Sequence, residues 1–320
     1  MADVRVGIVS WNTADLLDRC LAALPAALAG LDAEIVVLDN DSADGSADVA
    51  ARHDGIDVIR NPENVGYARG MNRALAGSTA PVLIALNPDT EAPPGSLAAL
   101  VRRLLDDPGA GLVVPQLINA DGSLQHSVYR FPSIAVALAV GLVPASLQRR
   151  TGLGRHFWLE GASAHDAPAT IDWAIGAVHV IRVAALDGEQ PYSERWFMYA
   201  EDTELCWRLT RAGWTVKLEP DVVVPHIGNA SGEQAWGKER AARFWAASYD
   251  LVALRRGRVY ARLWAAVNTA VVALHIVLRT IGSRLPGNRA HRRRTLPELR
   301  SVLPVHARAV WRGADPAMVR

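Results

Sequence analysis

Several acidic side chains and one histidine lie at positions in the sequence where they could transfer protons or bind a metal ion. Asp39 and Asp89 each follow an apolar run, and Glu201-Asp202 and His226 come later in the chain. Carboxylates and imidazoles transfer protons, and carboxylates bind hard cations such as Mg²⁺, which complete their coordination with substrate phosphates. Asp89, at the end of an Asn-Pro-Asp turn, is therefore the candidate for holding a cation and, through it, a diphosphate.

An alternation of apolar runs and helical patterns must position these residues. The runs predicted as strands are 4–10, 34–39, 57–60, 81–86 and 112–115, with helices at 15–28, after 45, at 67–76 and after Pro94. Strands separated by such helices form a parallel sheet, whose ligands lie beyond the carboxyl ends of the strands. Ser10, Asp39 and Asp89 all fall at such ends.

The second half of the sequence has a different pattern. Strands are predicted at 171–181 and 214–224 around a helix at 202–212, and a further helix at 241–254. The uncharged stretch 263–278 would form a helix of about 24 Å, shorter than the roughly 30 Å hydrocarbon core of a bilayer. Residues 133–147, interrupted by Gly141 and Pro144, are predicted not to form a regular helix, and 148–170 are predicted to be a loop.

Composition and charge limit the class of protein. Half of the residues are hydrophobic and 21% are charged, which excludes a wholly disordered chain. Two scattered cysteines fit a reducing compartment, and no secretory signal peptide is expected. Residues 251–320 carry 14 Arg, no Lys and two acidic residues, so this basic part is expected to meet an anionic surface, either nucleic acid or phospholipid.

Several enzyme classes are excluded by missing motifs. The strand at 4–10 is followed by Trp11-Asn12-Thr13 and not by the Gly-x-Gly-x-x-Gly of dinucleotide-binding proteins. The phosphate-binding loop of P-loop NTPases and the Gly-x-Ser-x-Gly of α/β-hydrolases are absent from the sequence as well.

Five motifs occur in a characteristic order. They are Val9-Ser10-Trp11-Asn12, Val37-Leu38-Asp39-Asn40 with Ser42 and Gly45, Asn64-Val65-Gly66 with Asn72, Asn87-Pro88-Asp89, and Glu201-Asp202 with Arg208. This ordered set, covering about residues 4–230, resembles the family 2 inverting glycosyltransferases. Three segments narrow the resemblance to one branch of the family: the Asn-Pro-Asp motif, Trp173-Ala174-Ile175-Gly176 and residues 197–202. They look most like the corresponding segments of bacterial rhamnosyltransferases that act on polyprenyl-diphosphate-linked N-acetylglucosamine.

The resemblance implies an α/β fold of the GT-A type, a Rossmann-like, mostly parallel central sheet with flanking helices. Residues 1–240 would form the glycosyltransferase domain, with the nucleotide-sugar half at 1–120 and the acceptor half at 121–240. Residues 241–320 would form a basic, helical and amphipathic C-terminal region associated with a membrane.

Donor-binding roles also follow from the resemblance. Asp39 would hydrogen-bond the nucleotide base, Ser10 would line the same pocket, and Arg69 would offset nucleotide charge. The full set implied for the nucleotide sugar is Ser10, Asn12, Asp39, Asn64, Arg69, Asn72 and Asn87. Each of these roles has an alternative. Asp39 could be a helix or turn cap, Ser10 could be a structural hydroxyl, and Arg69 could be a solvated side chain.

The family's catalytic roles fall on the later acidic residues. Asp202 would be the general base that takes the proton of the acceptor hydroxyl, with Glu201 beside it, although either carboxylate could instead cap the helix.

Asp89 and His226 would hold Mg²⁺ or Mn²⁺, with Asn87 in place of the family's first carboxylate; an Asn-Pro-Asp turn without metal is the alternative. Gly176, Trp173 and Arg208 would line the acceptor site, where core packing is the alternative for the tryptophan.

The implied partners are a dTDP- or UDP-sugar, a lipid-linked or other saccharide acceptor, and the anionic cytoplasmic face of the cell membrane, without nucleic acid. The sequence lacks the Gln-x-x-Arg-Trp signature of processive synthases, which favours transfer of one sugar in cell-wall or polysaccharide biosynthesis. Alternatives are galactofuranosyl or other hexosyl transfer, a sugar-phosphate nucleotidyltransferase, and a non-catalytic membrane-surface module. The C-terminal helix could also simply pack on its own domain.

Overall fold

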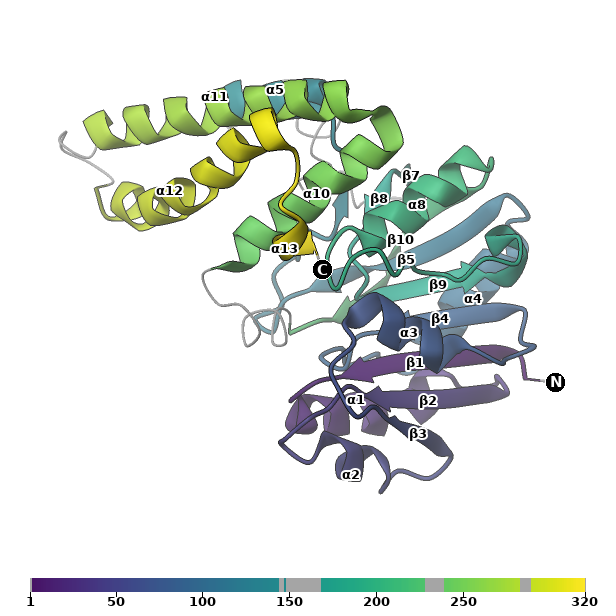
Figure 1. The fold of residues 1–320 in the computed structure, drawn as a ribbon. Helices are drawn as coiled ribbons and strands as arrows, with labels where there is room; N and C mark the ends of the chain where they lie inside the picture. Colours follow the sequence, from purple (N-terminus) through teal and green to yellow (C-terminus); the bar gives the residue numbers. More distant parts are fainter. Residues whose placement is uncertain (1, 144–146, 148–167, 228–238, 283–288, 320) are drawn as a thin grey trace. The chain divides into compact units, whose positions relative to one another are not determined.

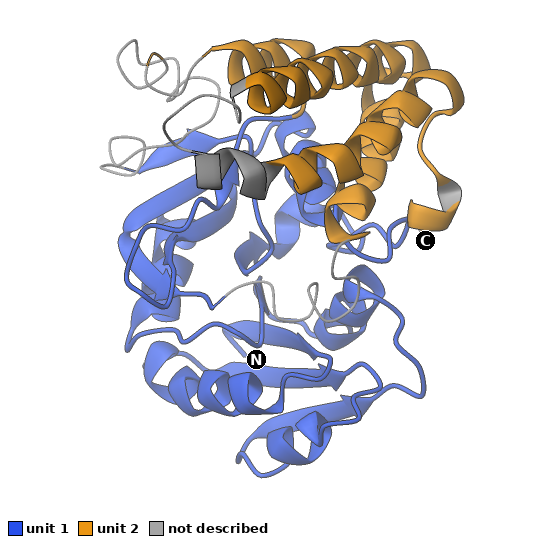
Figure 2. Ribbon diagram, turned by 90° about the vertical axis from the view of Figure 1, so that its left-hand side faces the viewer, with its two compact units in different colours: residues 1–131, 160–231 blue, residues 132–159, 232–320 orange. Residues whose placement is uncertain are grey.

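The computed structural model describes residues 2–143, 147, 168–227, 239–282 and 289–319 (Figure 1). Most of the predicted loop at 148–170 therefore lies outside the described residues. The described chain forms two compact units, Met1–Phe131 with Glu160–Ser231 and Pro132–Leu159 with Gly232–Arg320 (Figure 2).

An eight-stranded sheet forms the centre of the first unit. Its strand order is β3-β2-β1-β4-β9-β5-β10-β7. The bounds are β1 Val4–Ser10, β2 Ala33–Asp39, β3 Ile56–Arg60, β4 Val82–Leu86, β5 Ala110–Ile118, β7 Ala169–Ile171, β9 Val178–Arg182 and β10 Thr215–Pro225. Only β9 and β7 run antiparallel to their neighbours, which confirms the predicted mostly parallel sheet.

The single strand predicted at 171–181 is wrong. The chain there is divided among β7, β8 (Trp173–Ala174) and β9, and β8 pairs with β6 (Val128–Tyr129) in a separate two-stranded sheet. The apolar pattern is continuous, but Asp172 accepts a hydrogen bond from the backbone N–H of Phe131 at 2.7 Å and Gly176 lies in a turn. These long-range contacts are not encoded in a local periodicity.

Helices cover both faces of the sheet (Figure 1). Val4, Val6 and Ile8 of β1 point into one core, shared with leucines of α1 (Ala14–Ala27) and α4 (Ser96–Asp106). The alternate residues face α3 (Tyr67–Leu75), which packs so closely that a Cβ on Gly7 would lie 2.8 Å from Leu75 Cδ2. The other helical elements that the structure describes in the first unit are α2 (Ser46–Ala50), the 3₁₀ turn η2 (Val183–Leu186) and α8 (Glu201–Arg211).

The second unit is helical. Its described helices are α5 Ile134–Leu142, α10 Arg240–Arg256, α11 Arg258–Gly282, α12 Arg289–Arg312 and α13 Pro316–Val319. A small core built around Tyr249, Trp264 and Ala265 joins α10, α11 and α12.

Two predictions for these helices are wrong. The segment 133–147 contains the helix α5, because Ser133 Oγ caps it by accepting from Val136 N at 3.2 Å and Pro144 falls beyond its end. The helix predicted from 263–278 has 25 residues and begins at Arg258, directly after Gly257 with its φ of 87°. Its length of about 37 Å is enough to cross a bilayer, and 258–281 is also apolar enough to do so.

Candidate active site

The carboxyl ends of the first three strands meet at one edge of the sheet. Ser10 at the end of β1 is paired in register with Asp39 at the end of β2, and Asp39 with Arg60 of β3. Asn40 N donates to Ser10 O at 2.8 Å, and Asn61 N donates to Asp39 O at 2.9 Å. This edge therefore brings together Ser10 and Asp39, two of the residues predicted to bind a nucleotide.

Asp39 presents a buried acceptor at this edge. Its side chain is buried, and Oδ2 accepts from Ser42 N at 3.2 Å. Oδ1 has no hydrogen-bond partner among the described residues. A buried polar atom left without a partner costs free energy, so this oxygen fits a donor from a ligand.

Ser10, Asn12 and Asn64 shape the surrounding loops. Ser10 Oγ hydrogen-bonds Thr13 Oγ1 at 2.8 Å, and Asn12, in left-handed backbone with φ 53°, accepts from Ala43 N at 2.8 Å through Oδ1. Asn64 Oδ1 accepts from Asn40 Nδ2 at 2.7 Å. These contacts hold the turns after β1 and β2 against each other.

Asn72 and Arg69 lie on α3 and bind another part of the chain. Asn72 Nδ2 donates to Tyr192 O at 2.7 Å, and its Oδ1 accepts from Tyr192 N at 3.0 Å. Arg69 Nε pairs with Glu194 at 3.1 Å on a half-exposed surface. Both residues thus anchor the segment that precedes α8, and their part in donor binding stays a prediction.

Asp89, His226 and Asn87 face one another. His226 Nε2 lies 3.2 Å from Asp89 Oδ1 and 3.5 Å from Asn87 Nδ2, and both Asp89 and His226 are buried. The backbone fixes this approach, because Ile227 N donates to Asp89 O at 2.9 Å and Thr90 forms a β-bridge with His226.

This donor set fits a divalent cation that takes most of its coordination from a ligand. One carboxylate and one imidazole face each other, and the described residues hold no group of three or more His, Cys, Asp or Glu side chains that could bind a metal ion. Mg²⁺ and Mn²⁺ at phosphate sites use few protein ligands and complete their shells with phosphate oxygens and water.

Glu201 and Asp202 open α8 after a strained turn. Tyr199 and Ala200 both have left-handed backbone, with φ of 71° and 69°. Such conformations are unfavourable for residues other than glycine and cluster at functional sites. Asp202 Oδ1 accepts from Thr203 N at 2.6 Å, whereas the buried Oε2 of Glu201 has no partner within the described chain.

The two carboxyl groups differ in acidity. Burial raises the pKa of Asp202 to about 6, against hydrogen bonds from Thr203 that lower it. Burial, followed by the charge of Asp202, raises the pKa of Glu201 well above its ordinary value. The hydrogen bonds from Thr203 thus offset burial at Asp202, whose pKa of about 6 leaves it mostly ionised near neutral pH, whereas burial and the charge of Asp202 both disfavour ionisation of Glu201.

Tyr67 connects the two acidic groups of the site. Its hydroxyl donates to Gly176 O at 3.0 Å, and a Cβ on Gly176 would lie 3.4 Å from that hydroxyl and 3.8 Å from Asp202 Cβ. Burial raises the pKa of Tyr67, and the charges of Glu201, Asp202 and Asp89 raise it further. One phenol thus lies within electrostatic reach of both Asp89 and Asp202. Sequence reasoning missed Tyr67, although its place directly after Asn64-Val65-Gly66 was the available signal.

Of the three residues predicted for the acceptor, Gly176 lies beside Asp202, where an added Cβ would be 3.8 Å from Asp202 Cβ. Trp173 is buried, stacks on Tyr129 with ring centroids 4.6 Å apart, and donates to Arg130 O at 3.0 Å. Arg208 donates to Pro191 O at 2.6 Å and to Gln190 O at 3.1 Å. A direct role for either side chain in acceptor binding stays a prediction.

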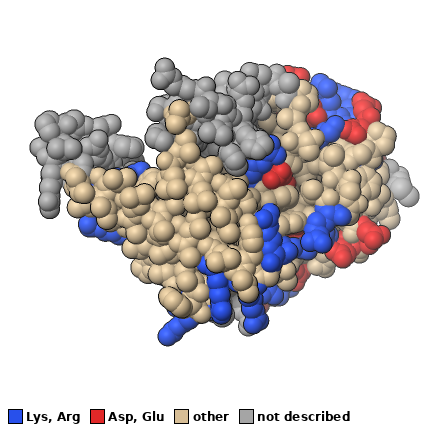
Figure 3. Space-filling view, turned by 90° about the horizontal axis from the view of Figure 1, so that it is seen from above, with Lys and Arg blue, Asp and Glu red and all other residues tan. Residues whose placement is uncertain are grey.

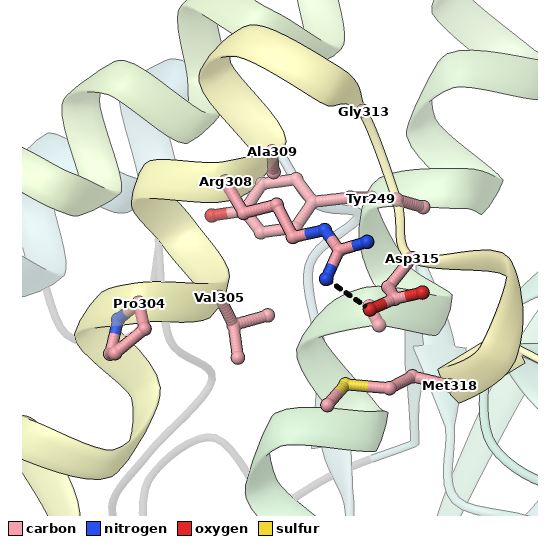
Figure 4. A pocket seen from close by; sticks show the side chains of 10 residues that line it. Tyr249, Pro304, Val305, Arg308, Ala309, Gly313, Asp315 and Met318 are labelled. Atoms are coloured by element: carbon pink, nitrogen blue, oxygen red, sulfur yellow. Dashed lines mark ion pairs between the residues drawn. The ribbon is translucent and has the colours of Figure 1, made fainter.

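A cavity of about 110 Å³ lies apart from these residues, within the second unit (Figure 4). Its lining is mostly apolar, and its two charged side chains, Arg308 and Asp315, pair with each other at 2.6 Å. Because the pair neutralises its own charge, we assign the cavity no chemical role.

Comparisons with known proteins show which sequences this chain resembles. Residues 5–145 match the family model described as Glycosyl transferase family 2. The N-acetylglucosaminyl-diphospho-decaprenol L-rhamnosyltransferase of Mycobacterium tuberculosis is 29% identical over 239 residues, which cover 71% of this chain and 76% of that protein. The pre-mycofactocin glycosyltransferase of the same organism is 28% identical over 227 residues, which cover 70% of this chain and 42% of that protein.

Solved structures share the fold. The mannosyltransferase PcManGT from Pyrobaculum calidifontis, in complex with GDP-Man and Mn²⁺, superposes with a TM-score of 0.60 at 17% identity, over 97% of this chain and 87% of that one. At this identity the likeness shows the fold alone, which is of the GT-A type.

Proposed function

Because this chain carries a family 2 glycosyltransferase domain with the GT-A fold, we propose that it transfers one sugar, with inversion, from a nucleotide sugar to a lipid-linked saccharide. The favoured donor is dTDP-L-rhamnose and the favoured acceptor is polyprenyl-diphosphate-linked N-acetylglucosamine. The name of the mycobacterial relative and the Asn87-Pro88-Asp89 motif support this choice. Galactofuranosyl or another hexosyl transfer is the alternative.

The observation that carries the proposal is the open space at Gly176, where a Cβ would lie 3.4 Å from the Tyr67 hydroxyl and 3.8 Å from Asp202 Cβ. Burial raises the pKa of this phenol, and the charges of Asp202 and, more weakly, Asp89 both raise it further. Inversion requires a base on the acceptor side of the anomeric carbon. Asp202, ionised near neutral pH, accepts the proton of the acceptor hydroxyl, and the absence of a side chain at Gly176 leaves room for that hydroxyl to approach. Burial and the charge of Asp202 raise the pKa of Glu201, which disfavours a second negative charge beside the base.

Asp39 binds the base of the donor. Its buried Oδ1 accepts a hydrogen bond from a ring N–H, which thymine and uracil both offer. Ser10, Asn12 and Asn64 hold the loops around it. A nucleotidyltransferase is disfavoured, because its glycine-rich, arginine-bearing loop would have to replace Trp11-Asn12-Thr13.

Asp89 and His226, with Asn87 beside them, would hold Mg²⁺ or Mn²⁺. When bound, the cation would stabilise the charge that grows on the departing diphosphate. A nitrogen ligand favours Mn²⁺ over Mg²⁺, which prefers oxygen. We expect Asp89→Ala to abolish transfer together with its dependence on metal, and unchanged activity in excess chelator would contradict a metal site.

The second unit holds the enzyme at the anionic cytoplasmic face of the membrane. One stripe of α11 is exposed and wholly apolar over about 33 Å of helix. It consists of Val259, Leu263, Ala266, Ala270, Leu274, Val277 and Ile281. The helix α5 is apolar on all sides, yet the structure buries none of its residues. A helix that is apolar all round is normally buried, so α5 fits an apolar surrounding.

α11 lies on the membrane in this proposal and does not cross it. Its opposite face packs through Trp264 and Ala265 against the core of the second unit. Arginines flank the apolar stripe, and each one near an anionic leaflet contributes about 1 kcal/mol. Figure 3 shows a broad uncharged surface bordered by Lys and Arg side chains, the pattern of an interfacial helix.

Binding and transfer of defined donors test the proposal. A ligand that binds the folded chain raises its melting temperature by mass action. We expect dTDP-L-rhamnose with Mn²⁺ to raise it more than UDP-sugars do, and to support transfer to a polyprenyl-diphosphate-linked N-acetylglucosamine. Stabilisation and transfer only with another nucleotide sugar would retain the glycosyltransferase and replace the donor.

A further inference from the structure

A glutamine outside the predicted motifs contacts the side of His226 that faces away from Asp89. Gln125 lies between β5 and β6 and is half-buried. Its Oε1 lies 2.7 Å from His226 Nδ1. Both ring nitrogens of His226 therefore have a neighbour, a glutamine on Nδ1 and a carboxylate on Nε2.

The orientation of the Gln125 amide follows from its other contacts. Its second polar atom lies 3.2 Å from the backbone oxygen of His226 and 3.0 Å from Asn119 Oδ1. A backbone carbonyl can only accept, so this atom must be the NH₂ group. The amide is thus fixed with Oε1 toward the imidazole.

This orientation fixes the tautomer of the imidazole. A carbonyl oxygen can only accept, so His226 Nδ1 carries the hydrogen in the 2.7 Å contact with Gln125 Oε1. In the neutral imidazole, the form that can bind a metal, the single N–H on Nδ1 leaves the lone pair on Nε2. Nε2 is the nitrogen that faces Asp89 Oδ1 at 3.2 Å.

We infer that Gln125 is a positioning residue that holds His226 as the Nδ1–H tautomer and so presents Nε2 to a divalent cation beside Asp89. The inference rests on the proposed function, which places the cation there. A partner on the second ring nitrogen of a ligating histidine sets its orientation, and its loss typically weakens metal binding 10- to 100-fold.

The tautomer can be measured without metal. In ¹⁵N-labelled full-length protein, long-range ¹H–¹⁵N spectra distinguish the two imidazole tautomers, and His226→Gln assigns the signal. We expect Nδ1–H in the original protein and in Gln125→Glu, which keeps the acceptor oxygen. Gln125→Met removes the acceptor and should give a mixture or the Nε2–H form. An Nε2–H tautomer in the original protein would overturn the inference.

Metal affinity gives the second readout. Mn²⁺ alone is titrated into each full-length variant and followed by electron paramagnetic resonance, with thermal unfolding as the check of folding. We expect Gln125→Met to bind Mn²⁺ about 10- to 100-fold more weakly and Gln125→Glu to stay within a few-fold of the original. Gln116→Met, at a half-buried glutamine of β5, is the matched control and should leave the affinity unchanged.

The outcomes separate this inference from the metal assignment. If His226→Ala weakens Mn²⁺ binding while Gln125→Met does not, the role of Gln125 is overturned and the metal site stands. If neither variant weakens binding, the inference and the proposed metal site both fail.

Discussion

Burial makes two neighbouring carboxyl groups chemically different. Glu201 and Asp202 are adjacent in sequence, yet Thr203 hydrogen-bonds only the second, and the buried Oε2 of Glu201 has no partner in the described chain. The hydrogen bonds from Thr203 therefore favour the ionised form of Asp202, whereas burial and the charge of Asp202 raise the pKa of Glu201.

The pH dependence of transfer follows from the raised pKa of Asp202. Above about pH 6 its carboxylate is ionised and can accept a proton, and below that value it is protonated and cannot. We expect kcat/KM to fall about tenfold per pH unit on the acid side of a pKa near 6. Glu201→Gln, which stays neutral, should keep this profile. A profile that is flat from pH 5 to 8 would contradict the assignment.

Asp39 should determine donor affinity. Replacing it with Asn removes a charged acceptor, and hydrogen bonds to charged groups contribute about 1.5–3 kcal/mol. We expect Asp39→Asn to weaken nucleotide binding by roughly 10- to 100-fold in calorimetry, with a smaller effect on kcat. Asp41→Asn is the matched control, because it is exposed and Asn tolerates its left-handed backbone. Equal effects of the two substitutions would argue against a base contact.

The start of α3 and the turn before α8, which are far apart in the sequence, meet at Gly66. Gly66 begins α3 with φ 83° and ψ 173°, and Tyr67 N donates to Phe197 O at 2.8 Å. A Cβ on Gly66 would lie only 2.3 Å from Phe197 O. The start of α3 therefore sets the position of the turn that leads into Asp202.

Gly66→Ala should disturb stability and catalysis together. The backbone region of Gly66 is one that only glycine adopts easily, at a cost of about 1–3 kcal/mol to other residues, and the clash with Phe197 adds to it. We expect lower stability in urea and a reduced kcat. Gly77→Ala has a similar φ of 75° with open space, so it should lose stability without loss of kcat. Normal kcat in folded Gly66→Ala would contradict the coupling.

Apolar patterns along the sequence predict the strands and helices of the first half of the chain well, and those of the second half less well. The strands at 4–10 and 34–39 end where expected because apolar runs close on polar turns. The strand β9 inserts between β4 and β5 through pairings that no local pattern encodes. The helix α5 was missed because an apolar run with a glycine looked interrupted, although Gly141 only makes room for Val271.

For the candidate site, too, local motifs can be predicted from the sequence, whereas long-range contacts cannot. Asp39, Asp89 and Asp202 can be proposed from the sequence because they end or follow a strand or lie at the start of a helix, within recognisable motifs, and their roles stay predictions. Tyr67 and Gln125 act through partners more than 100 residues away, which single-sequence patterns do not show.

At the scale of the whole molecule, one unit carries the candidate chemistry and the other carries the apolar helices (Figure 2). A lipid-linked acceptor is confined to the membrane, so an enzyme bound there searches a surface and not a volume. The proposed membrane attachment therefore belongs to the same function as the active site.

Vesicle binding tests this attachment. Leu263 and Leu274 are 55% and 41% exposed on the α11 stripe, and burying a leucine contributes about 1.5–3 kcal/mol. We expect Leu263→Gln with Leu274→Gln to weaken binding to anionic vesicles at least tenfold. Leu105→Gln, at a leucine of α4 that is 48% exposed, is the control and should have no effect. Equal vesicle binding by the original protein, the double variant and the Leu105→Gln control would contradict the membrane proposal.

The most direct test of the central claim is the rate of sugar transfer by Asp202→Asn, compared with its affinity for the donor. A positioned general base contributes about 10²- to 10⁴-fold to the rate. If Asp202 takes the proton of the acceptor hydroxyl, kcat falls by at least a factor of about 100 while donor affinity changes by no more than a few-fold. A variant that transfers sugar at nearly the original rate would contradict it.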